Sequence, residues 1–154
     1  MKIEFLQDTT EEEVKLLVVS AEYAGEAKRI TEELNRLYGD SIQAYLDNER
    51  IRIPCAEILR IFAQGKRVFC QTENGIFTLH ARLYETEEQL DPTLFVRISK
   101  CELVNKQKIL RLDLSLTGTI GIRLEGNVKT YTSRRYMPKI REIFSEQEKK
   151  GDCQ

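Results

Sequence analysis

The chain of 154 residues is 41% hydrophobic and 32% charged, which is enough for one buried core with a small appended unit. No run of about 18 apolar residues occurs, and the start of the chain lacks the uninterrupted apolar centre of a signal peptide, so we expect a cytoplasmic protein. The formal net charge of -1 hides an asymmetry: residues 1–40 carry ten acids against five bases, net -5, and residues 97–142 carry eleven bases against four acids, net +7. A basic half suits a polyanionic partner, although Lys and Arg that protect sheet edges would give the same pattern.

The first forty residues predict a small unit of two strands and a helix. Apolar residues alternate over 3–5 and 14–18, as in short strands, and residues 23–37 place apolar side chains at the spacing of an amphipathic helix that Gly39 ends. Residues 1–40 are too few for a core of their own. We expect this unit to pair with the same unit of a second chain or, through the acidic face of its helix, to contact a partner protein.

Beyond residue 40 the apolar spacing changes to two, which is typical of strands separated by turns such as Asp47-Asn48. The predicted strands cover residues 42–46, 51–53, 58–63, 66–71, 75–80, 94–98, 109–114, 119–124 and 128–132. A short helix is predicted over 83–90, and Ser133 is the expected N-cap of a final helix that ends near Phe144. This pattern predicts a mainly β fold of the α+β class, with antiparallel sheets and short helices.

The residues that metal sites and enzymes use are sparse. The cysteines lie far apart without a CxxC pair, so we expect reduced thiols at Cys55, Cys70, Cys101 and Cys153. His80 is the single histidine, and without a Cys/His cluster we expect neither a metal nor a cofactor. A Gly-rich phosphate loop, a paired-carboxylate motif and a nucleophile elbow are also missing from the sequence. We therefore predict that the protein is not an enzyme and has no small-molecule substrate.

Residues 94–105 decide the class of function. The stretch begins with Leu94-Phe95-Val96-Arg97-Ile98-Ser99-Lys100-Cys101, continues through an apolar pair to Asn105, and is followed by Ile109. It resembles the signature of the LytTR family of bacterial DNA-binding domains, in which Phe-X-Arg-X-His-(Arg/Lys/Asn)-Ser leads to an apolar pair, an Asn, and an Ile four residues later. Further matches follow the family order at residues 53–59, Leu83 with Leu90, and 133–136.

Two residues depart from that signature: Ser99 stands where the family has His, and Cys101 stands where it has Ser. The Arg-Ile-Ser-Lys form resembles a subgroup of small stand-alone regulators without a receiver domain. We interpret Cys101 as a small packed group, because free Cys is commonly buried. A redox-sensing thiol would have to be exposed and to have a lowered pKa.

A β-rich domain without a long recognition helix must read base edges from its loops, and long cationic side chains have the reach for that task. The resemblance implies base contacts at Lys100, at Arg135 and, jointly, at Lys66 and Arg67 in the turn after the first strand of the meander. Three further cations suit phosphate contacts, which fix the register and make the affinity depend on salt. These are Arg134, Lys106 and Lys129.

These observations predict a sequence-specific regulator of transcription that reads repeated half-sites of double-stranded DNA as a homodimer. The expected organisation is a strand-strand-helix unit over 1–40, a LytTR-type DNA-binding domain over 41–145 and a polar tail over 146–154. A small membrane protein that restrains the regulator is a further partner that the resemblance implies. The alternative is a protein-interaction module of a regulatory system that does not bind DNA directly.

Overall fold

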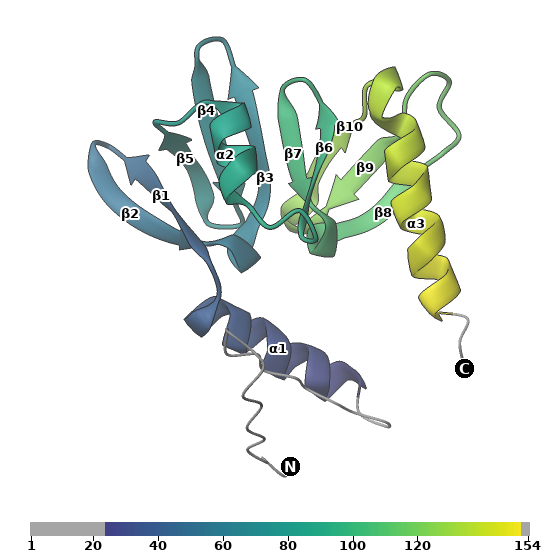
Figure 1. The fold of residues 1–154 in the computed structure, drawn as a ribbon, viewed down its shortest axis with the longest axis horizontal. Coiled ribbons are helices and arrows are strands. Elements are labelled where there is room, and N and C mark those ends of the chain that lie inside the picture. The colour runs from purple at the N-terminus through teal and green to yellow at the C-terminus, as the bar shows by residue number, and fades with distance from the viewer. Residues whose placement is uncertain (1–23, 152–154) are drawn as a thin grey trace, which may run out of the picture.

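The computed structural model describes residues 24–151, which form two antiparallel sheets with helices around them (Figure 1). The strands predicted over 3–5 and 14–18 lie outside the described residues. The described helices are α1 (Ala24–Tyr38), α2 (Leu83–Gln89) and α3 (Met137–Gly151). The described strands are β1 (Ser41–Leu46), β2 (Glu49–Pro54), β3 (Ile58–Gln64), β4 (Arg67–Thr72), β5 (Gly75–Leu79), β6 (Phe95–Ser99), β7 (Glu102–Asn105), β8 (Ile109–Asp113), β9 (Gly121–Leu124) and β10 (Val128–Tyr131). Single 3-10 turns join several of them: η1 (Cys55–Glu57), η2 (Lys106–Lys108), η3 (Glu125–Asn127) and η4 (Arg134–Tyr136).

The large sheet has the strand order β2-β1-β5-β4-β3-β7-β6, and the small sheet has the order β10-β9-β8. All the paired strands run antiparallel, so the predicted mainly β fold with short helices is confirmed. The turn between β1 and β2 holds Asp47 and Asn48 at φ values of 48° and 69°. Asp and Asn tolerate this left-handed conformation better than most residues, which explains why they mark the hairpin.

Two hydrophobic cores lie on opposite faces of the strands that connect the sheets. One core packs α2 against the large sheet, and the other packs β6 and β7 against the small sheet and α3. Neighbouring residues of β7 divide between them, because Leu103 belongs to the first core and Val104 to the second. Strands β3, β6 and β7 are therefore buried on both faces, and they hold the two halves of the domain together.

The C-terminal segment differs from the prediction. Ser133 does precede the segment, but its side chain makes no capping hydrogen bond, and η4 intervenes before α3 begins at Met137. Pro138 explains the later start, because proline is tolerated in the first turn of a helix and disrupts its interior. The helix also continues past Phe144 to Gly151, so the tail predicted from residue 146 is helical through Gly151.

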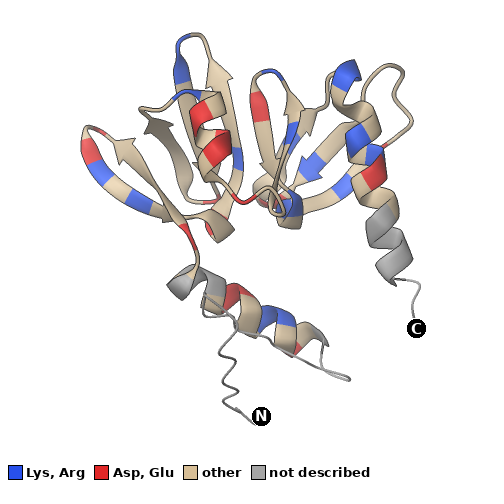
Figure 2. Cartoon of the chain, viewed as in Figure 1, with Lys and Arg blue, Asp and Glu red and all other residues tan. Residues whose placement is uncertain are grey.

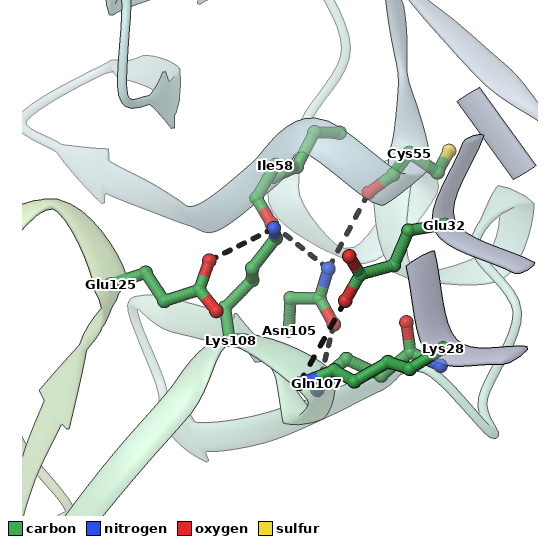
Figure 3. Close-up of polar contacts among 8 residues, drawn as sticks. All are labelled: Lys28, Glu32, Cys55, Ile58, Asn105, Gln107, Lys108 and Glu125. Atoms are coloured by element: carbon green, nitrogen blue, oxygen red, sulfur yellow. Dashed lines mark hydrogen bonds and ion pairs between the residues drawn. The ribbon is translucent and has the colours of Figure 1, made fainter. Parts of the chain in front are cut away.

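A buried amide ties the lower end of β7 to the start of β3 (Figure 3). Asn105 is fully buried and donates through Nδ2 to the carbonyl oxygens of Ile58 at 3.0 Å and Cys55 at 3.5 Å. Its Oδ1 accepts a hydrogen bond from the backbone N–H of Gln107 at 3.0 Å, which begins η2. This Asn therefore has a structural role, as its place at a strand end indicates.

Helix α1 lies below the large sheet in Figure 1, at the end away from the hairpin tips. It contacts η1 and β2, and the chain leaves it through Asp40, whose carbonyl oxygen accepts the N–H of Cys55 at 2.8 Å. An ion pair between Lys28 and Glu32 at 3.8 Å lies along its surface (Figure 3). No helix among the described residues is both long and apolar enough to cross a bilayer.

The described cysteines divide into two kinds. Cys55 and Cys70 are buried free thiols, and burial raises their pKa values to about 11 and about 12. Cys101 is instead exposed, in the turn between β6 and β7. The interpretation of Cys101 as a packed apolar group is therefore wrong, because the residue falls in a two-residue hairpin turn that projects beyond both cores.

Candidate nucleic-acid interface

Three turns that are distant in the sequence lie along one edge of the domain, at the top in Figure 1. They are the β3–β4 turn over 64–67, the β6–β7 turn over 99–101, and η4 (Arg134–Tyr136). We call these residues the turn edge. Because β3 and β7 are antiparallel neighbours, the last residues of β3 necessarily lie beside the first residues of β7.

Two backbone hydrogen bonds fix the three turns to one another. The N–H of Ala63 donates to the carbonyl oxygen of Cys101 at 2.8 Å, which joins the end of β3 to the β6–β7 turn. The N–H of Ser133 donates to the carbonyl oxygen of Ile98 at 2.9 Å, which joins the segment before η4 to the end of β6. The backbones of all three turns are thus fixed relative to one another.

Arg97 positions the β6–β7 turn from below. Its Nη1 donates to the carbonyl oxygen of Lys100 at 2.7 Å, and its Nε forms an ion pair with Glu87 of α2 at 2.6 Å. The Ser99 hydroxyl accepts the N–H of Cys101 at 3.2 Å, which closes the turn. The arginine of the family signature therefore orders the turn while Lys100 is left exposed at its tip. Sequence reasoning singled out Lys100 and missed this positioning role.

The segment that leads to η4 is fixed to Ile120, the residue just before β9. Thr132 receives a hydrogen bond at Oγ1 from the N–H of Ile120 at 3.1 Å, and its own N–H donates to the carbonyl oxygen of Ile120 at 3.0 Å. The Arg134 guanidinium lies against Gly118, where an added Cβ would come within 3.1 Å of Nη2. Gly118 has a φ of +76°, so a substitution there would strain the backbone and also crowd Arg134.

The turn edge carries exposed positive charge (Figure 2). Its exposed cations are Lys66, Arg67, Lys100, Arg134 and Arg135. In the described part of the chain, none of these side chains forms an ion pair, whereas the ion pairs that do form use Lys28, Arg60, Arg97 and Lys108. Unpaired cations on one edge leave a local positive field for an anionic ligand.

Two predicted phosphate contacts lie elsewhere. Lys106 is in η2, at the opposite end of β7 from the turn edge, and its Nζ donates to the carbonyl oxygen of Pro92 at 3.3 Å. Lys129 is on the outer face of the small sheet, with its Nζ 5.7 Å from the ring centroid of Tyr131. The structure therefore brings together the four predicted base contacts and Arg134, and leaves these two lysines apart from them.

Within residues 24–151, no group of three or more His, Cys, Asp or Glu side chains is placed to hold a metal ion. His80 is exposed and stacks on Tyr45, with ring centroids 3.6 Å apart and planes 8° apart. The histidine thus has a ring partner at the surface of the large sheet.

Comparison with known proteins finds relatives that match about two thirds of the chain. An uncharacterized HTH-type transcriptional regulator of Staphylococcus aureus (strain NCTC 8325 / PS 47) is 40% identical over 105 residues, which cover 68% of this chain and 71% of that protein. A protein of the same description from strain MRSA252 is 39% identical over 105 residues, which again cover 68% of this chain and 71% of that protein. In the chain described here, strands separate α1, α2 and α3, so the turn edge is built from hairpin turns and η4 and not from a helix-turn-helix pair.

The fold also matches a solved structure, the LytTr DNA-binding domain of a putative methyl-accepting/DNA response regulator from Bacillus cereus. The TM-score is 0.64 at 18% identity, and the match covers 68% of this chain and 95% of that one. The family model of the LytTr DNA-binding domain matches residues 48–145, which include the whole turn edge. This chain belongs to the LytTr DNA-binding domain family.

Proposed function

We propose that the protein is a transcription regulator that binds double-stranded DNA through its turn edge and recognises a specific sequence there. The observation that carries this proposal is the set of exposed, unpaired cations on three turns that backbone hydrogen bonds hold together. Family membership and the transcriptional-regulator descriptions of the S. aureus relatives support it.

In this proposal the exposed cations divide between base reading and backbone contact. Lys100 and Arg135 project from neighbouring turns and read base edges in a groove, where Arg favours the two acceptors of guanine. Lys66 and Arg67 occupy the third turn and read a further base. Arg134 contacts phosphate, which positions the protein without reading the sequence. Lys106 is omitted, because its Nζ lies near the Pro92 carbonyl oxygen at the far end of β7.

Repeated half-sites would require two turn edges in one assembly. We infer that residues 1–40 supply the contact between two chains, since α1 lies at the end of the domain opposite the turn edge and pairing there leaves that edge accessible (Figure 1). Static light scattering on the full chain and on a chain without residues 1–40 tests this. A shortened chain that is folded by circular dichroism and still dimeric would refute the assignment. A small membrane protein partner stays a prediction of the resemblance.

Salt dependence separates DNA binding from the alternative of a protein-interaction module. Affinity for a random duplex is measured by fluorescence anisotropy at several salt concentrations. Displacement of counterions from phosphates predicts a linear loss of log affinity with log salt, with a slope of about -0.9 for each phosphate neutralised. Absent binding, or binding that does not respond to salt, would favour the interaction module.

A further inference from the structure

The outer face of the small sheet carries a row of like charges. Arg111 of β8 pairs in register with Arg123 of β9, and Arg123 pairs with Lys129 of β10. All three side chains are exposed, and successive strands lie about 4.8 Å apart, so the row spans roughly 10 Å. We call Arg111, Arg123 and Lys129 the cation row. Like charges directly opposite one another destabilise a sheet, so the fold alone does not account for the row.

Among the described residues that line the same hollow, one acid, Asp113, offsets only part of the row's positive charge. None of the three cations forms an ion pair within the described residues, although Asp113 lies beside them in the same hollow. The Asp113 carboxylate is engaged by Ser115, whose N–H and hydroxyl both donate to Oδ1. These hydrogen bonds, with a smaller contribution from Lys129 and Arg111, lower the pKa of Asp113, so that carboxylate is charged at neutral pH and the three cations still exceed it.

The row lines a hollow of about 330 Å³ that is open to solvent. Gly121 supplies part of its surface, where an added Cβ would come within 3.2 Å of the Asp113 Cβ. The exposed ring of Tyr131 follows Lys129 on the same face of β10. A small-molecule site usually encloses most of its ligand, and this hollow is at the lower end of the size range of such sites. An extended ligand that contacts the surface from one side fits better.

The cation row is connected to the turn edge by a short rigid path. Strand β10 carries Lys129 and ends at Tyr131, and η4 begins with Arg134 three residues later. Lys129 and Arg134 are five residues apart, which is at most roughly 17 Å of extended chain, so positive charge continues from the turn edge onto the outer face of the small sheet. A polymer of regularly spaced phosphates matches a continuous basic surface of this kind.

We propose that the cation row binds backbone phosphates of the duplex that flanks the bases read by the turn edge. This inference rests on the proposed function and extends it: the DNA site is longer than the bases it specifies, and the flank contributes affinity without sequence preference. The mutual repulsion within the row is relieved when phosphates lie against it.

The test combines DNA length with a charge substitution. A duplex selected by the full-length protein from a random pool is prepared in two forms, one ending at the selected bases and one with about ten further base pairs, one helical turn, on each side. Wild-type protein is expected to bind the long duplex about tenfold more tightly than the short one at low salt. In Arg123→Gln this ratio should fall to about twofold, because the centre of the row is neutral.

Arg50→Gln is the matched control, because Arg50 is also an exposed strand arginine but lies on β2, at the far edge of the large sheet. It should keep the wild-type ratio. Thermal unfolding should show Arg123→Gln to be at least as stable as wild type, and Lys129→Gln gives a second variant if it is not. An unchanged length ratio in both row variants overturns this inference and leaves the proposed function standing. Failure of the full-length protein to bind any duplex overturns both. Saturable binding of pyrophosphate without DNA, lost in Arg123→Gln, would show that the row serves a small anion instead.

Discussion

Lysines lie near both ends of β7, but the lysines at one end have partners within the protein and the lysine at the other end is exposed. At the lower end, Lys108 forms an ion pair with Glu125 at 3.0 Å (Figure 3). Lys106 donates there to the carbonyl oxygen of Pro92. At the upper end, Lys100 is exposed at the tip of a turn and has no acidic partner among the described residues. A count of charges along the sequence therefore does not distinguish the two ends. The contacts of each lysine show whether its ammonium group already has a partner within the protein.

The largest expected effect is on stability and belongs to the lower end. Asn105→Ala removes the buried amide that donates to the carbonyl oxygens of Ile58 and Cys55, and it removes the side-chain acceptor of the Gln107 N–H. The Cys55 oxygen keeps the N–H of Ile58 as a donor. The free energy of unfolding should fall by roughly 3 kcal/mol, as measured by urea denaturation. Gln107→Ala, at an exposed position, is the control and should change it by less than about 0.5 kcal/mol. A loss of DNA affinity in folded Asn105→Ala protein would contradict a purely structural role for the lower end of β7.

The next effect is on specificity and belongs to the upper end. Arg135→Ala should remove roughly 1–3 kcal/mol of discrimination at one base position, because a side chain that reads a base edge is lost. Arg134→Ala should weaken binding to all sequences about equally. Affinities for a panel of single-base variants of a selected duplex measure both. If Arg135→Ala discriminates between bases as well as the wild type does, Arg135 does not read a base, and the proposal of DNA binding still stands.

A smaller effect separates the two lysines directly. Lys100→Gln should make the slope of log affinity against log salt less steep by up to about 0.9, if the ammonium also displaces a counterion on binding. Lys106→Gln should leave that slope unchanged, because its side chain lies at the other end of β7. Equal changes in the two variants would mean that DNA contacts both ends, and would remove the distinction between them.

The smallest effect concerns the cysteines. Cys101 is exposed at the turn edge, while Cys55 and Cys70 are buried with pKa values raised to about 11 and about 12. A Cys153→Ser protein treated with iodoacetamide at pH 8 should therefore be alkylated at Cys101 alone, as read by mass spectrometry. Because the folded-state pKa values of the buried thiols are raised, their contribution to stability is complete below about pH 9 and declines as the pH rises from there toward 11 and 12. Rapid alkylation of Cys70 in the native protein would contradict its burial.

Most strands and turns could be predicted, and the exceptions have physical causes. Strand β7 was not predicted as a separate strand, because its apolar residues Leu103 and Val104 are adjacent and enter different cores, so the alternating pattern is absent. The predicted start of α3 is too early. Ser133 resembles an N-cap in the sequence, but it precedes η4, and Pro138 lies in the first turn of the helix itself.

The sequence predicts the exposed cations of the turn edge, but it does not predict the residue that positions one of the turns or the cation row. Lys100 and Arg135 are predicted contacts because the resemblance marks their positions, and both are exposed on the turn edge. The role of Arg97 depends on Glu87 and on a carbonyl oxygen three residues away, and the cation row depends on the register of β8, β9 and β10. Such relations arise only when the strands pair, so they could not be predicted from spacing in the sequence.

The most direct test of the central claim maps the DNA contact onto the two ends of β7. Backbone amide chemical shifts of isotope-labelled full-length protein are followed by NMR as a selected duplex is added. We expect the amide signals of residues 64–67, 99–101 and 134–136 to shift and those of residues 105–108 to stay in place. Shifts concentrated at 105–108, or no shifts at the turn edge under saturating DNA, would contradict it.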